Sequence, residues 1–271
     1  MTVITTQRQK SLKLIQQLRL MDDDFLRLYF NNFPEGVKFI LDIILERNDL
    51  NIIQSQTQSE YKSIAGRSIS LDIYAEDNEG KKYNIEIQRS DSGATPKRAR
   101  FHSSMIDTKL LKKNEKFDNL AETYVIFITE NDVIGKGLPL YHFDRYCKET
   151  GDYMNDEAHI IYVNGAYQNV DDSIGRLMHD FQCIDADDMY NNELAERFRY
   201  FKEKQGGKDN MCRLVEEYAE AYAEEQINLQ RKKDIERMLN QGILTHEQIA
   251  VSLDVSIDFV KNIADNREIA N

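Results

Sequence analysis

Two short segments separated by a turn constrain the fold of this chain most. Residues 69–75 (ISLDIYA) and 83–89 (YNIEIQR) each alternate apolar and other side chains with a period of two, which is typical of β-strands. Between them, residues 77–80 (DNEG) are rich in turn formers. The sequence therefore predicts a β-hairpin of two adjacent antiparallel strands.

The alternation places acidic side chains together on one face of this predicted hairpin. Residues at even spacing on a strand share a face, so Asp72 lies opposite the apolar face of the first strand. On the second strand Glu86 and Gln88 share a face, and strand pairing can bring Asp72 beside them. Two carboxylates and the backbone carbonyl of Ile87 would form a set of hard oxygen donors suited to Mg²⁺, with Mn²⁺ as a substitute.

Such a site fits one kind of chemistry in particular. Cleavage of a phosphodiester needs charge neutralisation at the phosphate, activation of a water and help for the leaving oxygen, and one or two Mg²⁺ ions can supply all three. The alternative is that these polar residues simply face water, as they do on any one-sided antiparallel hairpin. The spacing of Asp72 and Glu86 alone leaves both interpretations open.

The segments around the hairpin predict an α/β fold in which helices cover a sheet. Helix-spaced apolar residues are followed by a short strand, and a helix with a basic face follows the hairpin, with Thr95 as its cap and Pro96 in its first turn. Dense apolar runs then indicate buried strands. The predicted helices are 22–32, 34–47 and 95–113, and the predicted further strands are 51–57, 124–129 and 159–163.

The C-terminal third is expected to be helical and increasingly charged, starting near residue 173. Residues 205–208 (QGGK) are predicted to be a linker, and residues 242–266 are predicted to form two short helices that resemble a helix-turn-helix. Because the second of these helices carries few donors for a DNA groove, we favour packing or protein interaction, including self-association. The predicted organisation is an N-terminal arm (1–21), a main domain (22–204) and a helical extension (208–271).

Charge and cysteine content narrow the classes of function. The net charge of −12 argues against a protein that coats DNA generally, but not against an enzyme with one local basic patch. Cys147, Cys183 and Cys212 form no CxxC pair, which fits a reducing cytoplasm rather than a disulfide framework. No run of about 18 apolar residues is present, so no membrane span is expected.

Several strings along the chain, taken together, resemble the PD-(D/E)XK nuclease superfamily. They include SISLDIYAED, YNIEIQR, PKRARFHSS, ETYVIFITEN and HIIYVNG, and the resemblance covers roughly residues 22–200. Within the superfamily, the chain is most similar to the recombination-promoting nuclease/transposase family. The resemblance implies a restriction-endonuclease-like core, with a mixed central sheet flanked by helices. It also implies Mg²⁺-dependent DNA endonuclease activity linked to recombination or mobile elements.

The resemblance assigns roles to the hairpin residues. It implies that Asp72 bridges the metal and that Glu86 is a second ligand, while Gln88 stands where the wider superfamily usually has lysine. Glu35, which follows Pro34 on a predicted helix, matches the acidic helix position and would complete the metal shell. The alternative for Glu35 is a first-turn glutamate favoured by the helix dipole.

The predicted basic helix at 95–113 supplies the candidate phosphate contacts. Arg98 matches an arginine of the family, with Lys97, Arg100 and Lys109 as helpers by position, and His102 stands where the family usually has tyrosine. The alternative is a solvated basic helix face.

Three functions remain open on the sequence. The leading one is a Mg²⁺-dependent DNA endonuclease. A catalytically weak or inactive nuclease fold that acts as a mobile-element accessory or protein-binding factor is the second, favoured by Gln88 and by the acidic net charge. An RNase of the same fold is the third.

Overall fold

The computed structural model of the chain describes residues 12–61 and 68–268. Contacts divide the chain into two compact units, Met1–Leu214 and Val215–Asn271, and each is described by itself. Within the described ranges, no helix combines the length and the apolar character needed to cross a membrane.

A six-stranded mixed sheet forms the centre of the first unit, with strand order β1-β2-β3-β4-β6-β5. Strands β1, β2 and β3 are antiparallel to one another, β3, β4 and β6 are parallel, and β5 runs antiparallel at the far edge. This mixed sheet confirms the predicted fold class. The strands are β1 (Ile52–Tyr61), β2 (Ile69–Asp77), β3 (Lys82–Gln88), β4 (Thr123–Thr129), β5 (Leu140–Phe143) and β6 (Ala158–Asn164).

The predicted hairpin is strands β2 and β3. Their ladder starts beside the turn and reaches the pair Ile73 and Ile85, one residue short of Asp72 and Glu86. Beyond that point β2 stays paired with β1, and β3 stays paired with β4. Opposite Asp72, the β1 residue Gln58 has a left-handed backbone (φ 55°) that interrupts the β1–β2 ladder. The two central strands therefore separate where the acids occur.

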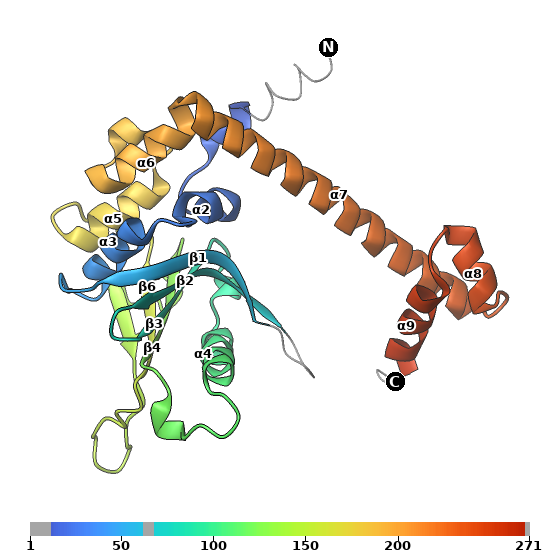
Figure 1. Cartoon of the computed structure of the whole chain (residues 1–271), viewed down its shortest axis with the longest axis horizontal. Coiled ribbons are helices and arrows are strands. Elements are labelled where there is room, and N and C mark those ends of the chain that lie inside the picture. Colours follow the sequence, from blue (N-terminus) through green and yellow to red (C-terminus); the bar gives the residue numbers. More distant parts are fainter. Residues whose placement is uncertain (1–11, 62–67, 269–271) are drawn as a thin grey trace. The chain divides into compact units, whose positions relative to one another are not determined.

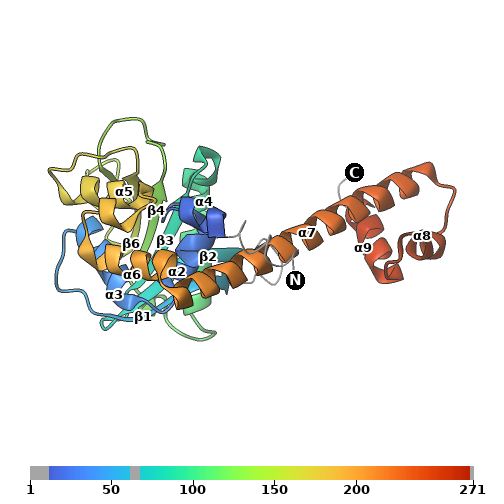
Figure 2. The ribbon, with the colours of Figure 1, turned by 90° about the horizontal axis from the view of Figure 1, so that it is seen from above.

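Helices cover both faces of this sheet. Helices α2, α3, α5 and α6 lie on one side, and α4 lies on the other (Figure 1). Seen from above, α2, α3 and α6 lie across the strands (Figure 2). The helices of this unit are α2 (Asp23–Phe30), α3 (Pro34–Ile44), α4 (Pro96–Leu110), α5 (Ser173–Gln182) and α6 (Asn192–Glu203), with short 3₁₀ helices η1 (Asp91–Gly93), η2 (Phe117–Asn119) and η3 (Ala186–Asp188).

An aromatic cluster fixes α2 against α6. The ring of Phe25 packs edge-on against Phe198 at 5.1 Å between centroids, and both side chains are fully buried. The hydroxyl of Tyr29 donates to the carbonyl of Leu194 at 2.6 Å. Because aromatic side chains bury large apolar areas, this cluster sets the position of α2 on the sheet.

The N-terminal segment is held more firmly than the predicted arm. Residues 12–17 are helical, and Ile15 is fully buried. The amide of Gln16 donates to the carbonyl of Lys202 at 3.1 Å, and the Lys202 ammonium donates back to the carbonyl of Gln16 at 3.1 Å. The predicted arm is therefore buried at Ile15 and packed against α6 at Gln16, while residues 1–11 lie outside the described residues.

The predicted linker at 205–208 is instead the first turn of helix α7 (Gln205–Gln241). A Cβ at Gly207 would lie 2.1 Å from the carbonyl oxygen of Tyr200. Glycine is needed there because two backbone segments approach closely, and not because the chain is flexible. The prediction of a linker is thus wrong, since the sequence shows the glycines but not the backbone packed against them.

The second unit contains α8 (His246–Leu253) and α9 (Ile257–Glu268), as the two predicted short helices. Helix α8 begins with a capping box between Thr245 and Gln248. Its small core joins Ile235 of α7 with Ile249 of α8 and Val260 of α9. Three short apolar faces thus share one cluster.

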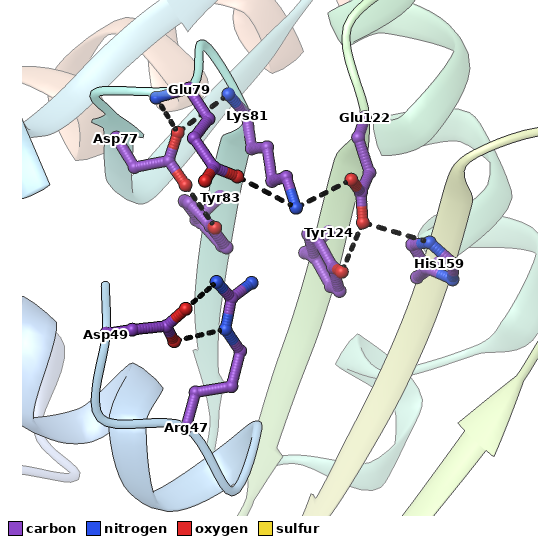
Figure 3. Close-up of polar contacts among 9 residues, drawn as sticks. All are labelled: Arg47, Asp49, Asp77, Glu79, Lys81, Tyr83, Glu122, Tyr124 and His159. Carbon is purple, nitrogen blue, oxygen red and sulfur yellow. Dashed lines mark hydrogen bonds and ion pairs between the residues drawn. The ribbon is translucent and has the colours of Figure 1, made fainter. Parts of the chain in front are cut away.

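A polar network stabilises the starts of β3, β4 and β6 (Figure 3). The rings of Tyr83, Tyr124 and His159 stack across these three strands, with centroids 5.2 and 4.7 Å apart. Lys81 joins the turn before β3 to Glu122 at 3.0 Å. The ends of these strands are therefore locked by side chains at the edge away from Asp72 and Glu86.

We expect Asp77→Ala to lower the free energy of unfolding by about 1–3 kcal/mol. Asp77 is buried, and its carboxylate accepts the N–H groups of Glu79 and Lys81, both at 2.9 Å, and the hydroxyl of Tyr83 at 2.8 Å. Removal leaves these donors without a partner in the tight turn. Urea denaturation measures the change, with the exposed Glu79→Ala as the control; equal midpoints for both variants would refute this role.

Candidate active site

The carboxylates of Asp72 and Glu86 meet where strands β2 and β3 separate. Oε1 of Glu86 accepts the backbone N–H of Asp72 at 3.3 Å, and Oδ2 of Asp72 accepts the backbone N–H of Ile87 at 3.0 Å. Each acid thus bonds to the opposite strand in place of the interrupted ladder. The expected convergence of the two acids is what the structure shows, and Ile87 joins them through its N–H.

Both carboxylates are withdrawn from water. Glu86 is fully buried and Asp72 is 7% exposed. Burial, and then the negative charge of Glu86, raise the pKa of Asp72 to about 7, against the opposing hydrogen bond from Ile87. Two acids held this close are disfavoured as a pair of anions, and a cation between them reverses that tendency.

Helix α4 adds a cation and an imidazole to the acids. Nη2 of Arg98 lies 3.4 Å from Oε2 of Glu86, and Nη1 donates to Oε1 of Gln88 at 3.3 Å. Nε of Arg98 donates to Nε2 of His102 at 3.4 Å, and Nδ1 of His102 lies 3.4 Å from Oε1 of Glu86. Thr95 caps α4, as predicted, by accepting the N–H of Arg98. Of the residues predicted on the basic helix, Arg98 and His102 therefore contact the acid pair.

Helix α2 contributes two residues that sequence reasoning missed. Nη2 of Arg27 lies 4.0 Å from Oδ1 of Asp72. Asp23 and Arg27 both line a cavity in front of the acids. Partial burial and the charge of Glu86 raise the pKa of Asp23, while Arg27 opposes the rise. Among the described residues, Nε of Arg27 is a buried donor without a hydrogen-bond partner. The sequence shows that Asp23 and Arg27 lie on a helix. It does not show that this helix brings them to the acids, because the packing of a helix on a sheet is a long-range property.

Three predicted residues lie away from this cavity. Glu35 is exposed on the first turn of α3, where its charge acts on Arg197 of α6. The structure thus does not bring Glu35 to the acid pair, and Asp23 is the helix carboxylate found there. Arg100 is exposed on α4, and the Lys109 ammonium lies over the ring of Tyr61 at 5.8 Å. Lys97 does line the cavity with Arg98.

The cavity in front of the acids has a volume of about 740 Å³. Its charged lining holds three cations against two carboxylates: Arg27, Lys97 and Arg98 against Asp23 and Asp72. Glu86 lies directly behind this lining, 3.4 Å from Arg98, so a chain with net charge −12 gathers three cations around its acid pair at this point. Such a hollow attracts a phosphate group through electrostatic focusing.

A second set of charges holds α2 at the cavity. Arg89, at the end of β3, pairs with Asp22 at 2.8 Å and with Glu130 at 3.3 Å. Arg19 also pairs with Glu130, at 2.8 Å. The residue before α2 is thereby tied to the carboxyl ends of β3 and β4, and the end of β3 carries Glu86.

The residues present fit a divalent cation. Carboxylate oxygens are the donors that Mg²⁺ and Mn²⁺ prefer, and Asp72, Glu86 and Asp23 supply them. Asn84 adds a second sign, because its buried side-chain oxygen has no hydrogen-bond partner within the described part of the chain, while its amide lies 3.3 Å from Nδ1 of His102. The raised pKa of Asp72 is a third, since a cation relieves the repulsion that contributes to it.

We expect the metal-free protein to lose stability as the pH rises from about 4 to about 7. The unfolded chain releases the Asp72 proton near the ordinary pKa of 3.8, whereas the folded state keeps it to about 7. The stability associated with this proton is therefore complete below the lower value and lost through the higher one. Thermal unfolding in a chelator measures it.

Asp72→Asn should flatten this slope, since the amide does not titrate. The exposed Asp118→Asn serves as the control and should keep the slope of the parent protein. Equal dependence on pH in the parent and in Asp72→Asn would contradict the assignment.

Comparison with known protein families gave a match over the middle of the chain. Residues 37–167 match the family model described as PD-(D/E)XK nuclease family transposase. The matched segment contains Asp72, Glu86, Gln88 and Arg98, and it excludes α2. Neither the search of curated proteins nor the search of solved structures gave a match. The predicted resemblance and the predicted fold class are thereby confirmed.

Proposed function

We propose that this chain is a metal-dependent endonuclease that hydrolyses phosphodiester bonds in DNA, and the match of residues 37–167 to the PD-(D/E)XK nuclease family transposase model supports this. Asp72 and Glu86 would hold Mg²⁺, or Mn²⁺ in its place, with Asp23 and the carbonyl of Ile87 as further ligands. A bound divalent cation supplies charge neutralisation at the phosphate and lowers the pKa of a water. The remaining roles fall to side chains of this chain.

Arg98 is the proposed phosphate-binding residue. Its guanidinium spans Glu86 and Gln88, and guanidinium forks match phosphate oxygens. Gln88 carries no charge, so the positive charge at this position of the site comes from Arg98. Lys97 and Arg27 line the same cavity and would hold neighbouring phosphates of the strand. Arg100 and Lys109 would at most contact DNA outside the cavity.

His102 is proposed to position Arg98 and Glu86. It is buried, and its two ring nitrogens face these two side chains at 3.4 Å each. A buried imidazole between an acid and a guanidinium restricts both, which keeps the acid aimed at its partner Asp72. A tyrosine, the usual residue of the family at this place, has one hydroxyl and would contact fewer groups.

One observation carries the proposal above all: two buried carboxylates on separating strands, beside a cavity lined by Arg27, Lys97 and Arg98. The test is nicking of supercoiled plasmid DNA in Mg²⁺ or Mn²⁺ by the parent protein beside Asp72→Ala. The proposal expects cleavage that a chelator stops and that the variant lacks. Equal cleavage by Asp72→Ala would point to another site or to a contaminant.

The second candidate is a nuclease fold with weak or no catalysis, which acts as an accessory or binding factor for a mobile element. The neutral Gln88 in place of lysine favours it. This candidate predicts that the parent protein binds DNA or a protein partner but does not nick DNA in the presence of any metal ion.

The third candidate is an RNase of the same fold. A parallel assay on RNA of the same sequence separates RNA cleavage from DNA cleavage.

The second unit is the proposed site of self-association. Ile243 and Val251 are 79% and 82% exposed, which leaves apolar surface beside the core of that unit. Sedimentation of the full chain and of Val251→Glu tests this self-association.

We also propose that the protein acts in the cytoplasm, because its cysteine content favours a reducing compartment.

A further inference from the structure

A cluster of three metal-binding side chain types lies at the end of α5. His179 is in the last turn of this helix, and Cys183 is its C-cap. Their spacing of four residues places them on one helix face. Nδ1 of His179 lies 3.5 Å from Sγ of Cys183 and 3.4 Å from Oδ1 of Asp180. One nitrogen, one oxygen and one sulfur atom all lie within 4.8 Å of one another.

These distances match the edges of a tetrahedral site. Bonds of about 2.0 Å to nitrogen and oxygen and about 2.3 Å to sulfur place nitrogen about 3.5 Å from sulfur and about 3.3 Å from oxygen. The observed separations from Nδ1 are 3.5 and 3.4 Å. Two of the three edges therefore already have tetrahedral length, and the third, between Sγ of Cys183 and a carboxylate oxygen of Asp180, is at most 4.8 Å.

Asp180 is held in place as ligating carboxylates usually are. Its Oδ1 accepts the N–H of Tyr190 at 2.7 Å, and its Oδ2 accepts the backbone and side-chain N–H groups of Asn191 at 2.9 and 2.7 Å. The two hydrogen bonds that Oδ2 accepts occupy both of its lone pairs, whereas Oδ1 keeps a lone pair on the side of His179. Hydrogen bonds of this kind orient a metal ligand.

The electrostatic surroundings favour a cation at the sulfur. The carboxylates of Asp180, Asp188 and Asp185 all act on the Cys183 thiol, and Asp180 has the largest effect of the three. The cation acting there is Lys202, and its ammonium donates to the carbonyls of Ile184 and Gln16. The carboxylates that disfavour a bare thiolate attract a divalent ion, and a coordinating thiol is deprotonated outright.

We propose that His179, Asp180 and Cys183 form a metal site for Zn²⁺ or another divalent ion of similar softness, with the fourth position filled by water. Imidazole and thiolate select such ions over Mg²⁺. His179 is 31% exposed at its side chain, which leaves solvent access to the fourth position. The site is separate from the Asp72–Glu86 pair and does not rest on the proposed nuclease activity.

A bound ion would join the end of α5 to the start of α6. Asp180 already contacts Tyr190 and Asn191, the residues just before α6. The same corner holds the N-terminal segment, because Phe181 accepts the backbone N–H of Met21 at 3.2 Å. The ion would therefore stabilise the first unit by fixing three segments at one point.

Titration of the full chain with Co²⁺, followed by Zn²⁺, tests the proposal. The exposed thiol is first removed by Cys147→Ser, which serves as the parent protein. The expected result is a near-ultraviolet thiolate-to-Co²⁺ band that saturates near one equivalent and disappears when Zn²⁺ displaces Co²⁺. Adding Cys183→Ser should abolish the band, and adding His179→Gln should weaken Co²⁺ affinity at least about tenfold.

Two further variants make the result specific. Cys212→Ser in the same parent should keep the band, and so should Asp72→Asn, because the band reports only a bound thiolate. Zn²⁺ should raise the unfolding temperature of the parent but not of Cys183→Ser, whose folding is checked by its own metal-free transition. No band in the parent, or a band of equal strength after Cys183→Ser, would overturn the site.

Discussion

Glu86→Gln is expected to lower metal-supported DNA cleavage at least about 100-fold while the protein stays folded. Glutamine keeps the volume of the fully buried side chain and one oxygen that can accept the N–H of Asp72. It removes one of the two negative charges that would hold the cation. A loss of several kcal/mol of transition-state stabilisation corresponds to a fall of this size.

The measurement is the single-turnover cleavage rate at saturating Mg²⁺ or Mn²⁺, with circular dichroism to verify the fold. Glu79→Gln is the matched control, because Glu79 is an exposed carboxylate in the turn before β3. The control should cleave at the parent rate. A Glu86→Gln protein that stays within about threefold of the parent would remove Glu86 from the site.

Arg98→Ala is expected to lower the same rate by about 10–100-fold. Its guanidinium contacts Glu86 and Gln88 and is the cation nearest to the buried acid, but it is 39% exposed, which limits the effect through solvent screening. Arg98→Lys keeps the charge and loses the fork, so it should restore only part of the rate.

Arg100→Ala controls for the general charge of α4. It removes an equal charge from the same helix at an exposed position outside the cavity lining. Its rate should stay within about threefold of the parent, apart from a weaker affinity for DNA at low salt. Equal losses in Arg98→Ala and Arg100→Ala would mean that the helix acts only as a basic surface.

The hairpin could be predicted because its signal is local. Alternation along residues 69–75 and 83–89 fixes which side chains share a face, and the turn between them fixes the pairing. The structure keeps both features and brings Asp72 and Glu86 together. The separation of the strands beyond Ile73 and Ile85 was not predictable, because the alternating pattern continues through Asp72 and Glu86 and gives no sign of where the pairing ends.

The contribution of α2 could not be predicted because it depends on long-range packing. Asp23 and Arg27 reach the cavity only because Phe25 and Tyr29 anchor the helix on α6, far along the sequence. The family pattern directed attention to Glu35 instead, one helix later. Residues of α4 were placed more successfully, since α4 follows the hairpin after a short connection.

The sequence-based expectations for the N-terminal segment and for the start of α7 differ from the structure for a related reason. The segment around Ile15 looks like an arm outside the main domain until the burial of Ile15 is known. The two glycines at 206–207 look like a linker until the backbone of Tyr200 is found against Gly207. In both cases the deciding contact lies on another element, and sequence periodicity carries no information about it.

Calorimetric titration of Mn²⁺ into the full chain tests the central claim most directly. The acid pair predicts a binding event in the parent protein that Mg²⁺ competes away and that Asp72→Asn and Glu86→Gln each abolish. Glu35 is an exposed carboxylate away from the cavity, so Glu35→Gln should bind Mn²⁺ as the parent protein does. Unchanged Mn²⁺ binding in Asp72→Asn or in Glu86→Gln would contradict the account.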